Sequence, residues 1–186
     1  MRRLLPLLFA LACAPRAEAP AEVPAFGLGR PPGPEVQAWD QDVRPDGVGL
    51  PAGSGDVRAG GEVYARQCAR CHGPTGVEGP QDPLVGRGEP VGFKLGSHPR
   101  GKSFVTVGNY WPYATTLYDY LRRAMPADAP GSLTPDEVYA LCAWLLWRND
   151  LLPAETVLDA ASLVRVQMPA RVRFVPDDRS IGASQR

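Results

Sequence analysis

The sequence predicts an all-α fold, in which a few helices are flanked on both sides by long irregular segments. Residues 114–124 and 135–149 carry apolar side chains at helical spacing. The second stretch has a strong start signal, because Thr134 can cap a helix and Glu137 completes a capping box. The 21 prolines and 20 glycines among 186 residues indicate that much of the remaining chain is irregular.

The first residues predict export from the cytoplasm. In "MRRLLPLLFALAC" two arginines precede an apolar run that is too short to span a bilayer, which is the pattern of a signal peptide. We expect this signal to occupy residues 1–19. Small residues before Cys13 resemble a bacterial lipoprotein cleavage site, so lipidation at Cys13 and ordinary cleavage a few residues later both stay open. The expected location is periplasmic, with membrane contact only through a lipid on Cys13.

Three further segments follow the signal. Residues 20–56 predict an extended Pro/Gly-rich arm, and its Trp39 favours an arm that lies across a surface, since linkers rarely carry tryptophan. Residues 57–150 hold the predicted helices, and residues 151–186 form a C-terminal extension with a brief helix around 154–161. The net charge is zero, from 20 basic and 20 acidic residues, so the composition gives no sign of a nucleic-acid partner.

The stretch "CARCHGPTG" concentrates the chemistry of the chain, and two of three readings fit it poorly. A structural zinc site needs four ligands, whereas Cys68, Cys71 and His72 supply three and no second CxxC exists. A thioredoxin-like pair needs its CxxC at a helix N-terminus after a strand. Here the motif follows a predicted helix over residues 57–68, and no alternating strand pattern precedes it.

Covalent haem fits the motif. Two thiols three residues apart on a helical turn can reach both vinyl groups of one porphyrin, and His72 then falls under the iron as the proximal ligand. By chance, a CxxCH motif would occur in roughly one in a thousand chains of this composition. We therefore expect one covalently attached haem c, held by Cys68 and Cys71. Export agrees, because haem c is attached outside the bacterial cytoplasm.

The sixth iron ligand has three candidates. Met125 lies 53 residues after His72, in "RRAMPAD" between the two predicted helices, where a turn can present its sulfur to the iron. Met168 lies in the C-terminal tail, and His98 lies in a polar Gly/Pro loop. Position favours Met125, with the other two as alternatives. A thioether ligand leaves no open iron site, which favours electron transfer over chemistry on a small molecule.

The order of helix, CxxCH, Gly/Pro loop, helix, Met-Pro and terminal helix over residues 57–150 resembles the monohaem cytochromes c. The resemblance implies the cytochrome c fold, with Gly60 and Tyr64 of the first helix packed under the terminal helix. It also implies that a proline carbonyl, of Pro80 or Pro83, accepts a hydrogen bond from the proximal histidine.

The same resemblance implies further haem contacts. Leu84 would face the haem, and the Trp111 indole N–H would bond a propionate. Arg122 and Arg123 are either solvated helix surface or contacts to a propionate or an acidic partner, and Arg87 is a weaker propionate candidate.

A closer resemblance runs from about Phe26 to Pro176, and "GNYWPYATTLYDYLRRAMP" is its most specific part. These residues resemble the cytochrome subunits of periplasmic sulfite and sulfane dehydrogenases, which pair with a molybdenum-cofactor subunit in bacterial sulfur oxidation. The resemblance implies an electron-accepting subunit without catalysis of its own, which passes electrons to a downstream cytochrome or oxidase. Some sulfane dehydrogenase cytochromes carry two haems, whereas this chain has one CxxCH, so the choice between the two relatives stays open.

Two other functions compete with this one. The first is a stand-alone or lipid-tethered shuttle cytochrome that delivers electrons to a terminal oxidase. The second is an enzyme with an open haem, such as a peroxidase, which requires that Met125 not bind iron and that His98 serve as the distal base. The placement of the Met-Pro pair disfavours the open haem.

Overall fold

The structure is a computed structural model that describes residues 33–37, 39–87 and 105–175. The chain divides into two compact units, Met1–Asp40 and Gln41–Arg186. The described part of the first unit contains one short helix, α1 (Pro34–Gln37). The predictions that concern the signal peptide, Cys13 and His98 lie outside the described residues.

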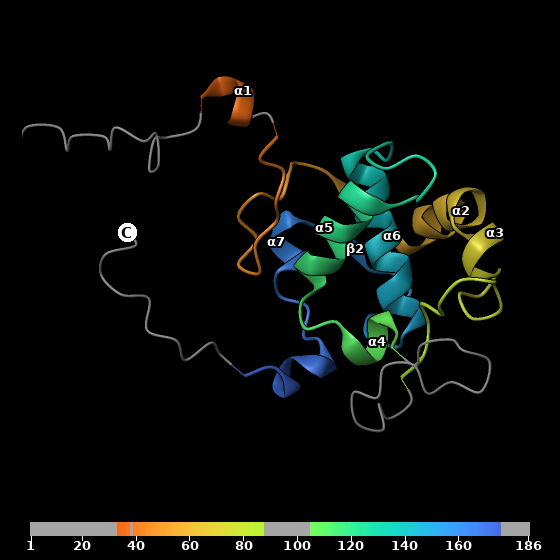
Figure 1. Cartoon of the computed structure of the whole chain (residues 1–186). Helices are drawn as coiled ribbons and strands as arrows, with labels where there is room; N and C mark the ends of the chain where they lie inside the picture. The colour runs from red at the N-terminus through yellow and green to blue at the C-terminus, as the bar shows by residue number, and fades with distance from the viewer. Residues whose placement is uncertain (1–32, 38, 88–104, 176–186) are drawn as a thin grey trace, which may run out of the picture. The chain divides into compact units, whose positions relative to one another are not determined.

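The second unit is mainly helical, as predicted (Figure 1). Its helices are α2 (Val57–Gln67), α3 (Ala69–His72), α4 (Val107–Tyr110), α5 (Ala114–Ala124), α6 (Pro135–Arg148), α7 (Ala160–Leu163) and the 3-10 helix η1 (Pro169–Arg173). The two helices with the clearest sequence signals, α5 and α6, have the bounds expected from their periodicity. In the described residues no helix has both the length and the apolar character that a membrane crossing requires.

Helix α6 begins where its capping box predicts. The Glu137 amide donates to Thr134 Oγ1 at 3.3 Å, and the Thr134 amide donates to Glu137 Oε2 at 3.0 Å. These two bonds satisfy groups that the first turn of a helix would otherwise leave unpaired. Helix α6 then runs through the centre of the unit, and its residues from Val138 to Leu146 are all buried.

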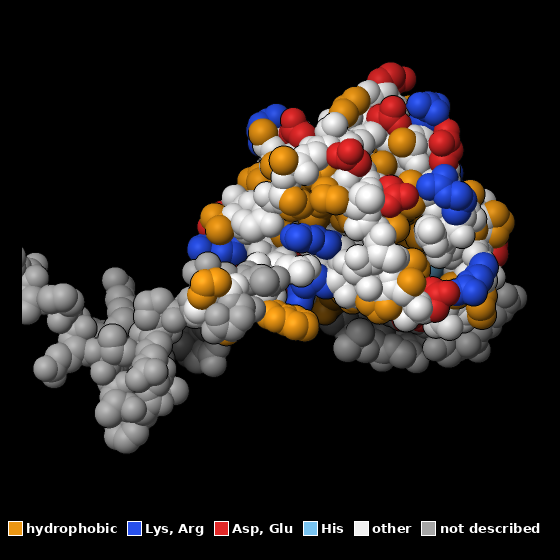
Figure 2. Space-filling model, turned by 90° about the horizontal axis from the view of Figure 1, so that it is seen from above, with side chains coloured by type: hydrophobic (Ala, Val, Ile, Leu, Met, Phe, Trp, Pro, Cys, Tyr) orange, Lys and Arg blue, Asp and Glu red, His pale blue; other side chains and the backbone are white. Residues whose placement is uncertain are grey.

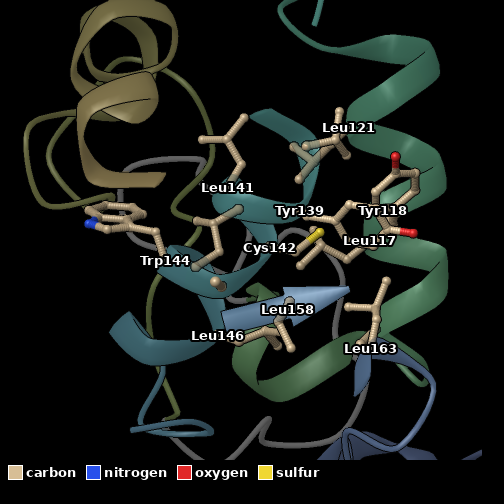
Figure 3. Packing of buried hydrophobic residues seen from close by; sticks show 14 of the residues in the cluster. Leu117, Tyr118, Leu121, Tyr139, Leu141, Cys142, Trp144, Leu146, Leu158 and Leu163 are labelled. Carbon is tan, nitrogen blue, oxygen red and sulfur yellow. The ribbon is translucent and has the colours of Figure 1, made fainter. Parts of the chain in front are cut away.

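Helix α2 crosses α6 at very short range, as the resemblance implied. A Cβ built on Gly60 would lie 1.9 Å from the Ala140 carbonyl oxygen, so only glycine allows the two backbones to come this close. One turn further on, the Tyr64 ring stacks on Trp144 with centroids 3.9 Å apart. On the opposite side of α6, Figure 3 shows Cys142 among apolar and tyrosine side chains next to α5.

A small antiparallel sheet joins the end of the arm to the C-terminal extension. Strand β1 (Ser54–Asp56) pairs with β2 (Val157–Asp159). The prediction of a helix around residues 154–161 is therefore wrong for Val157–Asp159, which form a strand. Leu158 is buried while its two neighbours are exposed, which is the alternation of a strand. The helix starts only at Ala160, because Asp159 caps it by accepting the Ser162 amide at 2.7 Å.

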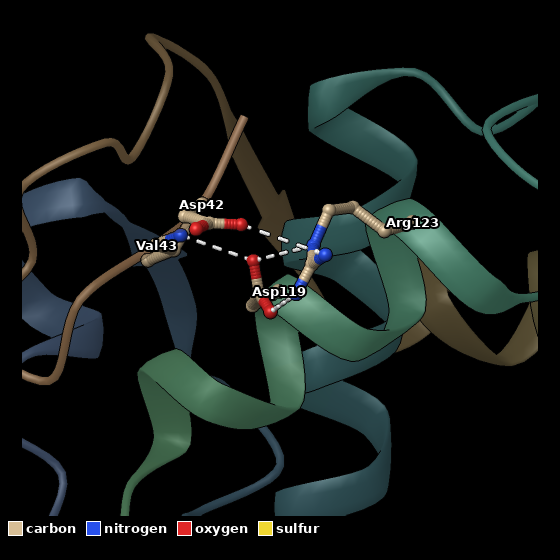
Figure 4. Close-up of polar contacts among 4 residues, drawn as sticks. All are labelled: Asp42, Val43, Asp119 and Arg123. Atoms are coloured by element: carbon tan, nitrogen blue, oxygen red, sulfur yellow. Dashed lines mark hydrogen bonds and ion pairs between the residues drawn. The ribbon is translucent and has the colours of Figure 1, made fainter. Parts of the chain in front are cut away.

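Residues 41–56 lie on the helical unit. The Val43 amide donates to Asp119 Oδ1 at 3.0 Å, and Figure 4 shows Arg123 paired with both Asp119 and Asp42. Further along, the Tyr139 hydroxyl donates to the Pro51 carbonyl at 2.8 Å. The segment thus contacts both α5 and α6 before it enters β1.

Candidate haem-binding site

One cavity of about 640 Å³ opens between α2, α3, α5 and the segments that connect them. Seven of the residues that the sequence predicts at the haem site line it: Cys68, Cys71, His72, Pro83, Leu84, Trp111 and Met125. Its volume lies within the range of roughly 300–1,000 Å³ that is usual for ligand and cofactor sites. Apolar and aromatic side chains from α5 and α6 complete the wall, among them Leu117, Leu121 and Leu145.

The two cysteines and the histidine share one helical turn. Cys68 ends α2, and its carbonyl accepts the amides of Cys71 at 3.1 Å and His72 at 3.0 Å. Gly73 ends the turn with φ of +83°, a conformation that favours glycine, and its carbonyl accepts the Tyr64 hydroxyl at 2.8 Å. The backbone thus places both thiols and the imidazole on the same cavity wall.

The His72 imidazole is oriented by a backbone carbonyl. Its Nδ1 lies 2.8 Å from the carbonyl oxygen of Asp82. The family resemblance implied a proline carbonyl in this role, of Pro80 or Pro83, and this expectation is wrong for both. The Gln81 amide donates to the Cys71 carbonyl at 3.0 Å, which anchors the start of this loop and brings the carbonyl of the next residue to the ring. With Nδ1 as the donor, Nε2 keeps the lone pair that binds a metal.

The surroundings of the Cys68 thiol oppose a thiol-redox role. Burial, and to a smaller extent the neighbouring Cys71, raises the pKa of the Cys68 thiol to about 11. A redox-active pair needs a thiolate near neutral pH, and this thiol is protonated there. Zinc is disfavoured too, because no group of three or more His, Cys, Asp or Glu side chains in the described ranges is arranged to hold a metal ion.

Met125 faces the same cavity from the end of α5. It follows the last helical residue, and its amide donates to the Leu121 carbonyl at 3.3 Å, which fixes where the loop leaves the helix. The loop is tied to the cysteine turn by an ion pair of 2.5 Å between Arg70 and Asp128, two residues that sequence reasoning missed. Arg70 also lowers the pKa of Asp128, chiefly through this hydrogen bond.

Of the two alternative sixth ligands, the structure describes Met168 and does not bring it to the cavity. Met168 is 5% exposed, does not line the cavity, and belongs to the apolar core together with Leu158 and Leu163. Its burial shows that the C-terminal extension contributes to the core of the unit. His98 is the other alternative, and it lies outside the described residues.

Of the residues considered as propionate contacts, Trp111 lines the cavity and the three arginines do not. Trp111 lines the cavity and meets Tyr120 edge to face, with centroids 5.5 Å apart. Arg87, Arg122 and Arg123 do not line the cavity. Arg123 pairs with Asp119 of α5 and with Asp42 of the arm. Arg87 donates to the Asp150 carbonyl at 3.2 Å, and Arg122 lies near Tyr118. The acidic partner of Arg123 is therefore supplied by its own chain.

The comparisons with known proteins agree with this geometry. The fold resembles a chain in the crystal structure of the sulfane dehydrogenase SoxCD from Paracoccus pantotrophus, with 41% sequence identity, a TM-score of 0.66, and coverage of 83% of this chain and 73% of that one. Residues 55–145 match a family described as cytochrome c oxidase, cbb3-type, subunit III. The chain belongs to the c-type cytochromes. Comparison of the cytochrome with curated proteins finds no match.

The residues of this cytochrome fit haem c, and the family implies that the haem is covalently bound. The cavity offers two thiols for thioether bonds, one imidazole with Nδ1 held, and one thioether sulfur, all within a mainly apolar wall. Haem iron supplies a one-electron couple. The protein would contribute the His72 imidazole and the Met125 sulfur as ligands, together with the apolar wall and the hydrogen bond to His72, which are features that set the potential of a haem.

Figure 2 shows one face of the molecule, on which basic and acidic side chains are interspersed with apolar ones. No wide area of a single charge sign occupies the described part of this face. The arrangement agrees with the zero net charge of the sequence.

Proposed function

We propose that this cytochrome accepts electrons from a molybdenum-cofactor subunit of the sulfite or sulfane dehydrogenase type, in the periplasm, and passes them to a downstream cytochrome or oxidase. The observation that carries electron transfer is the meeting of His72 and Met125 on one apolar cavity beside both cysteines. The partner is supported by 41% identity to a chain of the sulfane dehydrogenase SoxCD.

The roles of the residues follow from their chemistry. Cys68 and Cys71 would hold one haem through thioether bonds, and His72 and Met125 would ligate its iron. Pro83, Leu84 and Trp111 form the surrounding wall, where they limit access of water to the haem. Ligation of the iron by both side chains would leave no position for a substrate, so we expect the subunit not to be catalytic by itself. This is why electron transfer is favoured over a peroxidase.

Purification from the native periplasm tests the partner. We expect a complex that contains both molybdenum and iron, in which sulfite or a sulfane-sulfur substrate reduces the haem. The haem of the isolated cytochrome should stay oxidised with the same substrates. Molybdenum-free cytochrome in every fraction at low salt, or reduction by the substrate without any partner, would overturn the proposal.

A second candidate is a stand-alone or lipid-tethered shuttle cytochrome for a terminal oxidase. The match of residues 55–145 to subunit III of cbb3-type oxidase favours it. It predicts a monodisperse cytochrome that retains no dehydrogenase and whose reduced form is oxidised rapidly by oxidase-containing membranes. Mass spectrometry of the mature N-terminus completes the comparison, because diacylglycerol on Cys13 would establish the tether and cleavage after Cys13 would exclude it.

A further inference from the structure

Asn149 is a buried polar residue behind the cavity wall. It ends α6, is 1% exposed and does not line the cavity. Its Oδ1 accepts the Gly86 amide at 2.9 Å, while Nδ2 donates to the carbonyls of Leu84 at 3.2 Å and Leu145 at 2.8 Å. Both donors and the acceptor of the side-chain amide are thus in use. A fully satisfied buried group of this kind holds its neighbours in one geometry.

The segment held by Asn149 is fixed from a second side as well. The Val107 amide donates to the Leu84 carbonyl at 3.1 Å, and the Thr106 hydroxyl donates to the Gly86 carbonyl. The start of α4 and the end of α6 therefore clamp residues 84–86 between them. Packing around the clamp is tight, since a Cβ on Gly108 would lie 2.4 Å from Asn149 Oδ1.

The clamped segment belongs to the proximal side of the site. Leu84 lines the cavity, and Asp82, two residues earlier, carries the carbonyl that lies 2.8 Å from His72 Nδ1. We propose that Asn149 is a positioning residue for the proximal ligand: it fixes residues 84–86, which keeps the Asp82 carbonyl on the His72 ring and so sets the electron donation of the imidazole to the iron. This inference rests on the proposed role of His72 as an axial ligand.

The sign of the effect follows from ligand basicity. A carbonyl that accepts the Nδ1 proton makes the imidazole a stronger donor, and a stronger donor stabilises oxidised more than reduced iron. Release of the clamp weakens this bond, so it raises the reduction potential. A role confined to stability would lower the unfolding midpoint and leave the potential unchanged.

The first experiment compares Asn149→Ala with Cys142→Ala in the haem-loaded, full-length protein. Cys142 lies on the same helix, is completely buried and faces α5, so its truncation loosens the core at a residue that forms none of the hydrogen bonds of the clamp. For Asn149→Ala we expect at least a threefold shift toward reduced haem at a fixed mediator potential, which is about 28 mV at 59 mV per tenfold change. The control should lose stability and keep the wild-type potential.

A second readout follows the hydrogen bond itself. In reduced protein, the His72 Nδ1 proton should exchange with deuterated solvent at least threefold faster in Asn149→Ala than in wild type, and at the wild-type rate in Cys142→Ala. Asn149→Asp serves for this exchange measurement alone if the alanine variant does not fold: it keeps an acceptor for Gly86 and loses both donated bonds, but its carboxylate charge would itself lower the potential. Gly108→Ala should shift the potential in the same direction, since its methyl group displaces the Asn149 amide.

Haem-loaded Asn149 variants with wild-type potential and wild-type proton exchange would overturn the inference, as would equal shifts in Cys142→Ala. Neither result touches the proposed function, because the axial ligands would remain in place. If wild-type protein shows no histidine-ligated haem, the proposed function fails first and this inference fails with it.

Discussion

The crossing of α2 and α6 gives the sharpest test of the packing. Gly60→Ala would place a methyl group 1.9 Å from the Ala140 carbonyl oxygen, about 1.1 Å inside the 3.0 Å limit for Cβ contacts. The opposing atom is backbone, so no side-chain rotation relieves the clash, and the two helices must separate. Such overpacking costs about 3 kcal/mol. The better helix propensity of alanine offsets about 1 kcal/mol, which leaves about 2 kcal/mol of net destabilisation.

The neighbouring glycine supplies a matched control. A methyl group on Gly61 would meet only the Trp144 indole, at 3.1 Å from Nε1, and a side chain can give way by the few tenths of an ångström required. Gly61→Ala should therefore be neutral or up to about 1 kcal/mol more stable than wild type. Urea unfolding of the haem-loaded proteins, followed by helical circular dichroism, measures both. Free energies of unfolding within about 0.5 kcal/mol of each other would refute the close-approach reasoning, because errors of such measurements are of that order.

Three further outcomes are expected. Met125→Ala should abolish the iron–thioether absorption of the oxidised protein, whereas Met168→Ala should keep it and lose about 2–5 kcal/mol of stability as a core truncation. Glu78 accepts hydrogen bonds from the Thr75 hydroxyl and from backbone amides, and these bonds lower its pKa from 4.5 to about 2. Its contribution to stability is therefore complete above pH 4.5 and is lost as the pH falls toward 2. Glu78→Gln should make the unfolding free energy less dependent on pH in this range. Asp119→Asn should speed hydrogen exchange of the Val43 amide, because it weakens the acceptor of that bond.

Each of these has an outcome that contradicts it. An absorption band that survives in Met125→Ala and disappears in Met168→Ala would reverse the ligand assignment. Equal acid midpoints for wild type and Glu78→Gln would remove the proposed role of that carboxylate. For the arm, Asp42→Asn is the matched control, since Asp42 contacts Arg123 and not the Val43 amide; equal exchange in both variants would show that Asp119 does not hold the segment.

The parts of the fold that sequence predicts well are those with repeated or local signals. Helices α5 and α6 follow from apolar periodicity, and the start of α6 follows from side chains three residues apart that bond each other's backbone. The sheet cannot be predicted from the sequence, because each of its strands has only three residues and their pairing joins segments about a hundred residues apart. Three residues are too few for alternation to be distinguished from a helical turn.

The residues of the candidate site also differ in how well the sequence predicts them. Residues whose side chains do the chemistry, such as His72 and Met125, are recognisable from type and spacing, and the structure brings them to one cavity. The carbonyl that orients His72 is not recognisable in this way, because every residue carries one and only the path of the loop selects Asp82. Asn149 has no sequence signal beyond an asparagine at a helix end, which is common there for local reasons.

The most direct test of the account is intact and peptide mass spectrometry of the protein purified from its native periplasm. We expect the mature chain plus the mass of one haem, retained in acid, and a single modified peptide that contains both Cys68 and Cys71. Cys142 should remain a free thiol, since it is completely buried and is not paired in a disulfide. Cysteines 68 and 71 that are alkylated by a thiol reagent after denaturation, with no haem on their peptide, would contradict the central claim.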